Sequence, residues 1–322
     1  MWPPGYTDTL STQYAMQYEL AIVGGGPPGA AAAVYAARKR LKTLLIVDEW
    51  GGQSGISMEV QNWIGTPSIS GADLADALKK HAESYAGDYL TIKSRERATN
   101  LTANDDGVEI TTNNGTYTAQ TLLIATGASR RKLEVPGAKE FDQKGLTYCA
   151  SCDGPLFDGK DVVVVGGGNA GFETALQLLA YCKSVTLLHH GKEFKGDAIS
   201  IEAALSDPKM KGVKNAEPLE VLGEQFVTGL RFKHLDTGKE ETLNVEGVFV
   251  EIGIIPNTQW LGDTVNMTPF KQVVVDPETQ RTSHEKIWAA GDCANGLYHQ
   301  NNIAAGDAVK ALEDIYMFLR RS

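Results

Sequence analysis

The sequence predicts an α/β protein with two Rossmann-like nucleotide-binding domains. The prediction rests on a unit that occurs twice, in which a buried strand runs into a glycine-rich turn, a helix and a second strand. The two glycine clusters match position for position at an offset of 142 residues, from Gly24 to Gly166. A repeated strand–turn–helix–strand unit indicates two domains of the dinucleotide-binding type in one chain.

The composition is that of an ordinary globular protein. Of the 322 residues, 42% are hydrophobic and 22% are charged, and the formal net charge is −10. An acidic protein is poorly suited to bind nucleic acid or an anionic membrane surface, so we expect neither as a partner. Residues 1–17 form a polar arm without the features of a signal peptide, and no apolar run reaches the length of a membrane span. With four cysteines, which fit a reducing compartment, these features predict a cytoplasmic protein.

The first unit carries a complete dinucleotide-binding fingerprint. Gly24 allows a tight turn, Gly26 allows the backbone to approach a pyrophosphate, and Gly29 allows the helix to pack closely on the strand. The helix N-terminus then faces the phosphates of the bound dinucleotide. Asp48 or Glu49, after the second strand, accepts a hydrogen bond from a ribose hydroxyl of the same ligand. Strand, turn, helix and second strand are expected at 19–23, 24–29, 30–40 and 43–47.

A mixed region separates the two units. Apolar periodicity predicts a helix over 72–86, and turn signals within 89–117 predict several short strands. The apolar run that follows is expected to be a buried strand ending in a tight turn at Thr126 and Gly127.

The motif Cys149-Ala-Ser-Cys152-Asp153-Gly lies just before the second unit. Two cysteines separated by two residues form a disulfide that opens and closes in a catalytic cycle, and a carboxylate at Asp153 can pass protons to a thiolate. The alternative is half of a zinc site, which needs four ligands. The two remaining cysteines, Cys182 and Cys293, stand alone, so we favour the redox disulfide and expect no metal.

The second unit repeats the turn of the first but not its acidic end. Gly166, Gly168 and Gly171 occupy the three glycine positions, and His190 stands 24 residues after Gly166, where Asp48 stands 24 residues after Gly24. An acid is expected there for NAD and basic residues for the 2′-phosphate of NADP. Lysines without an arginine provide charge but no bidentate phosphate fork. We therefore treat the glycines and His190 as a candidate second nucleotide site, of doubtful fit to NADPH.

The last third of the chain is predicted to consist mainly of strands followed by one helix. Asp292, after an apolar strand, either contacts a ligand hydroxyl or N-caps the helix that begins near Ile303. One side of that helix is apolar and is expected to lie in the core or at a dimer face; it carries Ala304, Ala308, Leu312, Ile315 and Phe318. Strands are expected at 220–227, 230–235, 247–253, 272–276 and 287–290.

Taken together, these motifs resemble those of the low-molecular-weight thioredoxin reductases. The resemblance covers the chain from about residue 18, and the Cys-x-x-Cys-Asp-Gly motif at this location is its most specific part. The residues that carry it are both glycine turns, Gly-Gly-Gln at 51–53, Glu-Val-x-Asn-Trp at 59–63, Ala-Thr-Gly at 125–127, the motif at 149–154 and Ala-Gly-Asp at 290–292.

The resemblance implies a glutathione-reductase-type fold in which the second domain is inserted into the first. The FAD domain is expected at 18–125 and 250–322, and the NAD(P)-type domain with the cysteine pair at 126–249. It implies that Cys152 lies nearest the flavin, that Cys149 exchanges with a partner disulfide, and that Asp153 is the acid–base group. Residues implied to bind FAD are Gly24, Gly26, Gly29, Gln53, Asn62, Thr126 and Asp292, with Gln300 near the isoalloxazine ring. His299 beside it either contacts the flavin or caps the following helix.

The chain departs from the family pattern at the second nucleotide site. NADPH-using members carry His-Arg-Arg and a further arginine, where this chain has His189-His190-Gly191-Lys192 and Lys195. Their turn also usually ends in alanine, where this chain has Gly171. Similar flavoproteins without the basic motif take electrons from ferredoxin or from unidentified donors. The resemblance also implies that the protein is a homodimer.

Three hypotheses follow. The first is an FAD-dependent protein-disulfide reductase that passes electrons through Cys149 and Cys152 to a thioredoxin-like protein, from ferredoxin or another donor in place of NADPH. The second is a dithiol oxidase that closes a disulfide in a small molecule and uses oxygen as acceptor. The third is a flavin-binding regulatory or scaffold protein with a vestigial redox centre, which we disfavour because the cysteine pair and the FAD motifs are intact.

Overall fold

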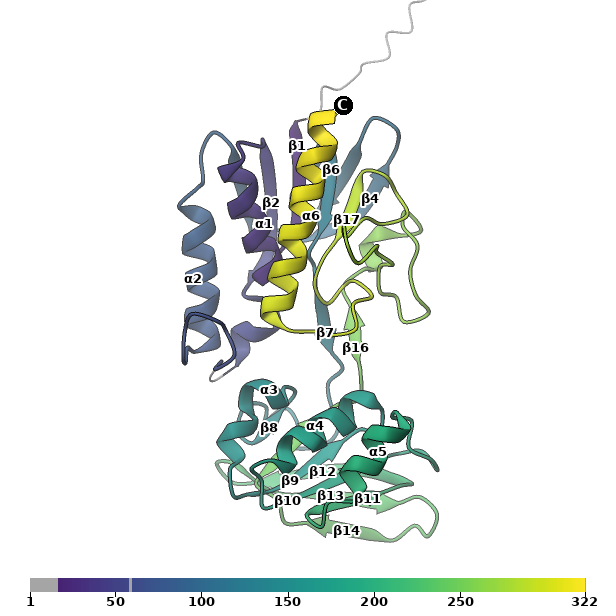
Figure 1. Ribbon diagram of the computed structural model, residues 1–322. Helices are drawn as coiled ribbons and strands as arrows, with labels where there is room; N and C mark the ends of the chain where they lie inside the picture. The colour runs from purple at the N-terminus through teal and green to yellow at the C-terminus, as the bar shows by residue number, and fades with distance from the viewer. Residues whose placement is uncertain (1–16, 58–59, 322) are drawn as a thin grey trace, which may run out of the picture.

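The computed structural model describes residues 17–57 and 60–321. They form two lobes stacked end to end, each an α/β unit around its own sheet with a parallel core (Figure 1). The fold class predicted from the sequence is therefore confirmed. The N-terminal arm up to residue 16 and Glu59 lie outside the described residues.

The first lobe is built from both ends of the chain. Its sheet has the order β3-β2-β1-β6-β5-β4, with β17 paired to β6. Strands β1, β2, β3, β6 and β17 run parallel, while β4, β5 and β6 form an antiparallel meander. The strands are β1 Tyr18–Gly25, β2 Thr43–Trp50, β3 Leu90–Ser94, β4 Ala98–Ala103, β5 Val108–Thr112, β6 Thr116–Ile124 and β17 Ile287–Ala289.

Helices α1 and α6 lie against each other on one face of this sheet (Figure 1). The apolar side of α6 predicted from the sequence is buried there, and Ala308, Leu312 and Ile315 are fully inaccessible. Of the two predicted locations, the core and a dimer face, these residues therefore occupy the core. Trp288 of β17 packs under the same helix. The helices of this lobe are α1 Pro27–Arg38, η1 Gly52–Ile56, α2 Gly71–Glu83, η3 Gln259–Leu261 and α6 Asn301–Arg321.

The second lobe is made by the middle of the chain. A parallel sheet of order β11-β10-β9-β15-β8 carries α3, α4 and α5, and an antiparallel sheet β12-β13-β14 lies beneath it. Val250, assigned to the FAD domain from the sequence, ends β15 and pairs with Val165 in this lobe. The elements are β8 Leu146–Thr147, α3 Ala150–Asp153, η2 Gly154–Phe157, β9 Asp161–Val165, α4 Asn169–Leu179, β10 Ser184–Leu188, α5 Ala198–Leu205, β11 Met210–Val213, β12 Ala216–Gly223, β13 Val227–His234, β14 Glu240–Leu243 and β15 Gly247–Val250.

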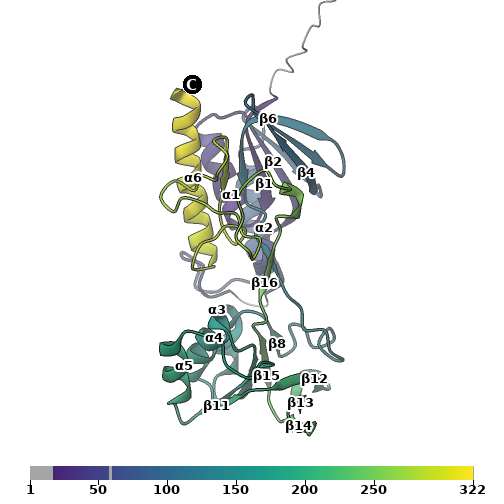
Figure 2. The same ribbon diagram turned by 90° about the vertical axis from the view of Figure 1, so that its right-hand side faces the viewer.

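Two short strands connect the lobes. β7 (Ala128–Arg130) leaves the first lobe, β16 (Ile254–Pro256) returns to it, and the two pair antiparallel as a narrow ribbon (Figure 2). The second lobe is thus an insertion held by one two-stranded crossing.

Some boundaries differ from the sequence-based prediction. β2 continues to Trp50 because Gly25 pairs with Trp50 after a register shift, so Asp48 and Glu49 lie within the strand. The strand expected at 272–276 is reduced to single bridges of Val273, because Lys271 turns the chain with a left-handed φ of 65°. β12 begins four residues before the expected 220 and accommodates Pro218 at a register shift in its pairing with β13.

Candidate functional site

A disulfide joins Cys149 and Cys152 on the short helix α3. Cys149 is the N-cap residue, and its Sγ accepts a hydrogen bond from the backbone N–H of Cys152 at 3.2 Å. Cys152 is buried, while Cys149 is partly exposed. An amide aimed at sulfur is the environment that favours a thiolate once the bond opens. The pair is therefore arranged for thiol–disulfide exchange.

The other two cysteines do not join this pair. Cys182 and Cys293 are buried thiols, and burial raises the pKa of each to about 11. Such thiols stay protonated and unreactive. Among residues 17–57 and 60–321 no cluster of three or more histidine, cysteine or acidic side chains is placed to hold a metal ion.

Asp153 follows Cys152 at the end of α3 and is 5% exposed. Thr147 Oγ1 donates a hydrogen bond to Asp153 Oδ2 and also accepts one from the Cys149 amide at 3.3 Å. Burial raises the pKa of Asp153, and the Thr147 hydrogen bond opposes that rise. Within the described residues Oδ1 has no hydrogen-bond partner. The carboxyl group, next in sequence to Cys152, can therefore hold a proton.

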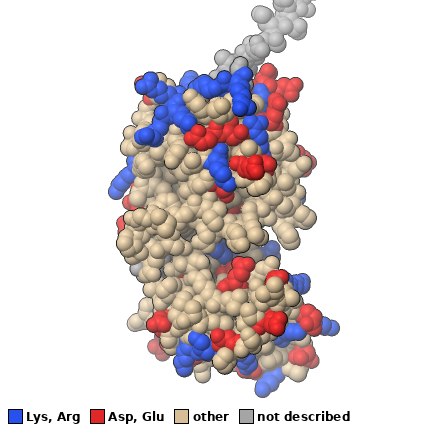
Figure 3. Space-filling view, viewed as in Figure 1, with Lys and Arg blue, Asp and Glu red and all other residues tan. Residues whose placement is uncertain are grey.

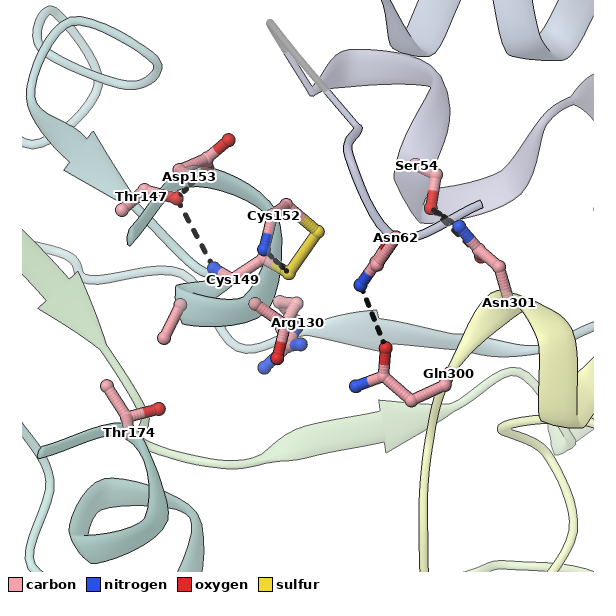
Figure 4. The surroundings of a disulfide bond; sticks show 12 residues. Ser54, Asn62, Arg130, Thr147, Cys149, Cys152, Asp153, Thr174, Gln300 and Asn301 are labelled. Carbon is pink, nitrogen blue, oxygen red and sulfur yellow. Dashed lines mark hydrogen bonds between the residues drawn. A yellow bond between two sulfur atoms is a disulfide. The ribbon is translucent and has the colours of Figure 1, made fainter. Parts of the chain in front are cut away.

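The disulfide is turned toward the end of the first lobe (Figure 4). There Asn62 Nδ2 donates to Gln300 Oε1 at 3.2 Å, and Ser54 Oγ lies 2.9 Å from Asn301 Nδ2. These contacts tie the segment after η1 to the start of α6. Segments from both ends of the chain therefore meet where the redox helix points.

The first glycine turn has the close backbone approaches that the fingerprint predicts. Gly24 has a φ of 129°, and a Cβ on it would lie 2.1 Å from Ala125 O. A Cβ on Gly29 would lie 1.8 Å from Gly24 O, so helix and strand touch there. By contrast, no described atom comes closer than 3.6 Å to a Cβ on Gly26, which leaves this face of the turn free at the N-terminus of α1. The turn thus offers open backbone N–H groups for a pyrophosphate.

The two acids near the end of β2, Asp48 and Glu49, are not equivalent. Asp48 Oδ2 is bound by Arg97 Nε at 2.6 Å and Nη2 at 2.5 Å. Glu49 forms part of the strand end opposite the glycine turn, where its carbonyl would lie 2.7 Å from a Cβ on Gly25. Arg97 therefore engages Asp48 Oδ2, so Asp48 and Glu49 differ in their surroundings.

Asp292 is held from two sides. Gln53 Nε2 donates to Asp292 Oδ2 at 3.2 Å, and His299 Nδ1 lies 3.3 Å from Oδ1. The following helix begins only at Asn301, so the N-cap alternative for Asp292 does not hold. His299 meets this carboxylate before α6 begins. Nearby, Gly127 has a φ of 63° and Thr126 Oγ1 donates to Asn257 O at 2.8 Å, as expected for a tight turn after β6.

This surface fits a bound dinucleotide. Gln53 Oε1 is buried without a hydrogen-bond partner among the described residues. A cavity of about 360 Å³ reaches Asp292, the residue that Gln53 contacts, although Gln53 itself does not line it. The cavity is lined in part by Gly291, Asp292, Tyr298 and Ala304. An open glycine turn together with convergent polar groups such as Gln53 and Asp292 is what a dinucleotide site requires.

The second glycine turn repeats the first. Gly166 has a φ of 132°, and its Cβ would lie 2.1 Å from Glu251 O, as Gly24 approaches Ala125. A Cβ on Gly171 would lie 1.9 Å from Gly166 O, and no described atom lies within 4 Å of one on Gly168. The backbone cradle is therefore preserved in the second lobe.

The chemistry around this turn differs from that of the first. His190 is exposed, whereas the ring of His189 packs on Gly167, whose Cβ would lie 2.5 Å from it. Burial lowers the pKa of His189, and its buried Nε2 has no partner among the described residues. His189 and the exposed His190 therefore do not offer the paired, rigid hydrogen-bond donors with which an arginine guanidinium binds a phosphate.

Sequence reasoning missed a buried ion pair at the lobe junction. The Glu251 carboxylate is 7% exposed and accepts from Arg130 Nη1 at 3.1 Å and from Thr174 Oγ1 at 3.0 Å. Burial raises the pKa of Glu251, and Arg130 opposes the rise. Figure 4 draws Arg130 and Thr174 among the residues that surround the disulfide, with Thr174 the farther of the two. The one available signal was an acid inside the apolar run 248–252.

Comparison with known proteins places the chain in a family. The family model for pyridine nucleotide-disulphide oxidoreductases matches residues 18–308. The chain is 37% identical over 306 residues to an NADH dehydrogenase of Bacillus subtilis and to a component of the alkyl hydroperoxide reductase of Staphylococcus aureus. These matches cover 95% of this chain but only 59% and 60% of the relatives, so the chain spans about three fifths of their length.

Solved structures give the same result. Thioredoxin reductase from Giardia duodenalis superimposes with a TM-score of 0.88 at 31% identity, covering 95% of this chain and all of that one. The enzyme from Streptococcus pyogenes gives 0.86 at 30% identity, covering 95% and 99%. The Lactococcus lactis enzyme in its FR conformation gives 0.66 at 30% identity, covering 95% and 100%.

The chain belongs to the pyridine nucleotide-disulphide oxidoreductase family. Within that family its fold is like that of the thioredoxin reductases, which match it over 95% of its length. Throughout the part of the chain that the structure describes, no helix is both long and apolar enough to cross a membrane.

Proposed function

We propose that the protein is an FAD-dependent protein-disulfide reductase of the thioredoxin-reductase type, with a thioredoxin-like protein as its electron acceptor. The observation that carries the proposal is the orientation of the Cys149–Cys152 disulfide toward the end of the first lobe, where Asn62 and Gln300 meet (Figure 4). When bound there, FAD supplies the two-electron carrier between a donor and the disulfide.

The chain's own groups account for the remaining steps. Cys152, buried on the side of the first lobe, is proposed to face the cofactor, and Cys149, the more exposed sulfur, to attack the partner. Asp153 holds the proton that a departing thiolate needs. Residues proposed to hold FAD are Gly24, Gly26, Gly29, Glu49, Gln53, Asn62, Thr126, Gly127, Asp292, His299 and Gln300.

A protein partner is supported by the surface around the junction. On the face shown in Figure 3, charged side chains of both signs gather at the outer end of the first lobe, whereas the half of that lobe nearer the junction is largely uncharged. The cores of protein interfaces are depleted of charge. Several solved relatives are thioredoxin reductases by name, which supports a thioredoxin-like partner.

As the electron donor to FAD, we propose a molecule or protein that carries no 2′-phosphate, in contrast to NADPH. The second glycine turn keeps its backbone cradle at Gly166, Gly168 and Gly171, while His190 and Gly191 stand where a phosphate fork would be required. Reduced ferredoxin remains one candidate. NADH is the other, supported by the intact cradle and by a relative that is an NADH dehydrogenase by name.

Anaerobic reduction of the purified FAD-loaded protein tests this. NADH, NADPH and reduced ferredoxin are added separately, and the flavin absorbance is followed. We expect fast bleaching with NADH or with ferredoxin and slow bleaching with NADPH; fast bleaching with NADPH would contradict the donor proposal. Turnover of oxidised thioredoxin then supports the reductase, while oxygen uptake with small dithiols and no thioredoxin turnover would favour the dithiol oxidase.

A homodimer and a cytoplasmic location remain part of the proposal. Light scattering of the FAD-loaded protein should give twice the chain mass, and a monomer mass would contradict the dimer.

A further inference from the structure

The side chain of Gln177 contacts both residues that separate the two cysteines. Ser151 Oγ donates to Gln177 Oε1 at 3.2 Å, and Gln177 Nε2 donates to the backbone carbonyl of Ala150 at 3.3 Å. Gln177 lies in the second half of α4, which packs beside α3 (Figure 1). One amide from a neighbouring helix thus contacts the middle of the Cys-x-x-Cys turn.

The same end of α4 supports the other end of the redox helix. Tyr181, two residues beyond α4, packs on Gly154 so closely that a Cβ there would lie 2.2 Å from its Oη. α3 has only four residues, and an isolated helical turn of this length is unstable in water. Its shape therefore depends on contacts from outside, of which Gln177 provides those to Ala150 and Ser151, and Thr147 provides those to Cys149 and Asp153.

The shape of this turn matters most after the disulfide opens. In the oxidised protein the S–S bond itself keeps residues 149 and 152 together. In the reduced protein only non-covalent contacts keep the Cys152 N–H, now 3.2 Å from Cys149 Sγ, directed at that sulfur. An amide that donates to a thiolate stabilises the reduced form. A contact that preserves the turn therefore stabilises the dithiol more than the disulfide.

We propose that Gln177 is a positioning residue that shifts the Cys149–Cys152 couple toward its reduced state. The proposal rests on the redox role of this disulfide within the proposed function and is independent of the identity of donor and partner. Reduction breaks the S–S bond and takes up two electrons and two protons from a dithiol, which becomes a disulfide in turn.

Equilibration of the FAD-loaded protein in anaerobic dithiothreitol buffers tests the proposal. After acid quenching and alkylation, mass spectrometry gives the fraction of protein in which Cys149 and Cys152 are reduced. Gln177→Met keeps the length of the side chain and removes both hydrogen bonds. We expect its equilibrium constant to move about tenfold toward the disulfide, which corresponds to about 30 mV for a two-electron couple.

Three further variants separate positioning from general stability. Gln177→Glu keeps an acceptor for Ser151 and should show a smaller shift. Ser151→Ala should also shift the equilibrium toward the disulfide. In the double variant Ser151→Ala/Gln177→Met, the free-energy shift should be smaller than the sum of the shifts in the two single variants. Glu173→Ala, exposed on the same helix one turn earlier, should behave as the wild type.

Thermal unfolding is measured in parallel. A Gln177→Met protein with a lower Tm but an unchanged equilibrium constant would overturn the proposal, as would a shift toward the dithiol. If Gln177→Met does not fold, an unchanged equilibrium constant in both Gln177→Glu and Ser151→Ala overturns it equally. Failure of the proposed function would appear as missing disulfide turnover in the wild type, whereas this inference fails only in the comparison between wild type and variants.

Discussion

Thr147 donates its hydroxyl proton to the carboxylate of Asp153 while the same oxygen accepts the backbone N–H of Cys149. One side chain therefore connects the proposed proton donor to the turn that carries the exchanging sulfur. Because a hydroxyl donor stabilises the ionised carboxylate, Thr147 works against the burial that raises the pKa of Asp153.

Thr147→Val should move the pH dependence of disulfide turnover. The substitution keeps the shape and removes the donor, so the pKa of Asp153 rises further, and its proton is retained to higher pH. We expect the alkaline limb of the pH–rate profile to move up by about one pH unit, the effect of one hydrogen bond to a charged group. Thr147→Ser, which keeps the hydroxyl, is the matched control; an unmoved limb in Thr147→Val would rule out this role.

The same variant should lose stability in a pH-dependent way. The folded-state pKa of Asp153 is raised, so its contribution to stability is fully present below the unfolded-state value and is lost as pH rises through the folded-state value. Thr147→Val enlarges that loss. Urea unfolding should therefore show a larger deficit at pH 7 than at pH 4, and an equal deficit at both would speak against a buried, titrating Asp153.

Cys152→Ser should retain FAD and lose disulfide turnover. The cysteine is buried on α3, and serine is close in volume, so the fold and the first glycine turn are preserved. The bound flavin is measured by absorbance, and turnover with thioredoxin as acceptor. Cys182→Ser is the control, since that thiol is buried and protonated and should leave turnover unchanged. Retained turnover in Cys152→Ser would defeat the assignment.

Gly26 and Gly168 allow the two nucleotide turns to be tested separately. Both have ordinary negative φ values, of −78° and −96°, and a Cβ on either meets no described atom within 3.5 Å, so alanine is compatible with the fold. Gly26→Ala should weaken FAD binding about tenfold or more by crowding the pyrophosphate, while Gly168→Ala leaves FAD binding unchanged. Fluorescence titration of the apoprotein with FAD measures both. Equal effects would show that the first turn is not the FAD site.

Arg130→Met should destabilise the protein by leaving Glu251 buried without its cation. Loss of one partner of a buried pair costs about 3–5 kcal/mol, and the partial exposure of Arg130, 30%, reduces our expectation to about 2 kcal/mol. Unfolding in urea at pH 7 measures the loss. Adding Glu251→Gln should recover most of it, because a neutral amide can keep the Thr174 hydrogen bond. No recovery would show that Arg130 acts by packing alone.

The glycine turns and the cysteine motif were predictable because local chemistry dictates them. A left-handed Gly24 and a Gly29 in contact with the strand backbone follow from the spacing of glycines between a strand and a helix. The burial of the α6 face followed equally from its apolar periodicity. In each case the residues that determine the outcome are neighbours in sequence.

The remaining features depend on residues far apart in the chain. Arg130 and Glu251 are separated by 121 positions, and Ser151 and Gln177 by 26, and neither pair forms a local motif. The pairing of Asp48 with Arg97 likewise depends on how the meander folds back over β2. Such contacts are fixed by tertiary packing, so the sequence contained their residues but no sign of their partners.

Because only the narrow ribbon of β7 and β16 connects it to the first lobe, the second lobe can be exchanged as a unit. Arg131 N donates to Gly253 O at 3.0 Å where the lobe begins and ends, and Asn257 N donates to Gly127 O at 3.0 Å on the other side of the crossing. If the chain were cut at this ribbon, the two new chain ends of each lobe would lie side by side. A short linker would be enough to join them in either lobe. A foreign lobe with a different nucleotide turn and a different cysteine pair can be exchanged at this crossing while the flavin lobe, whose sheet and helices are complete without it, stays as it is.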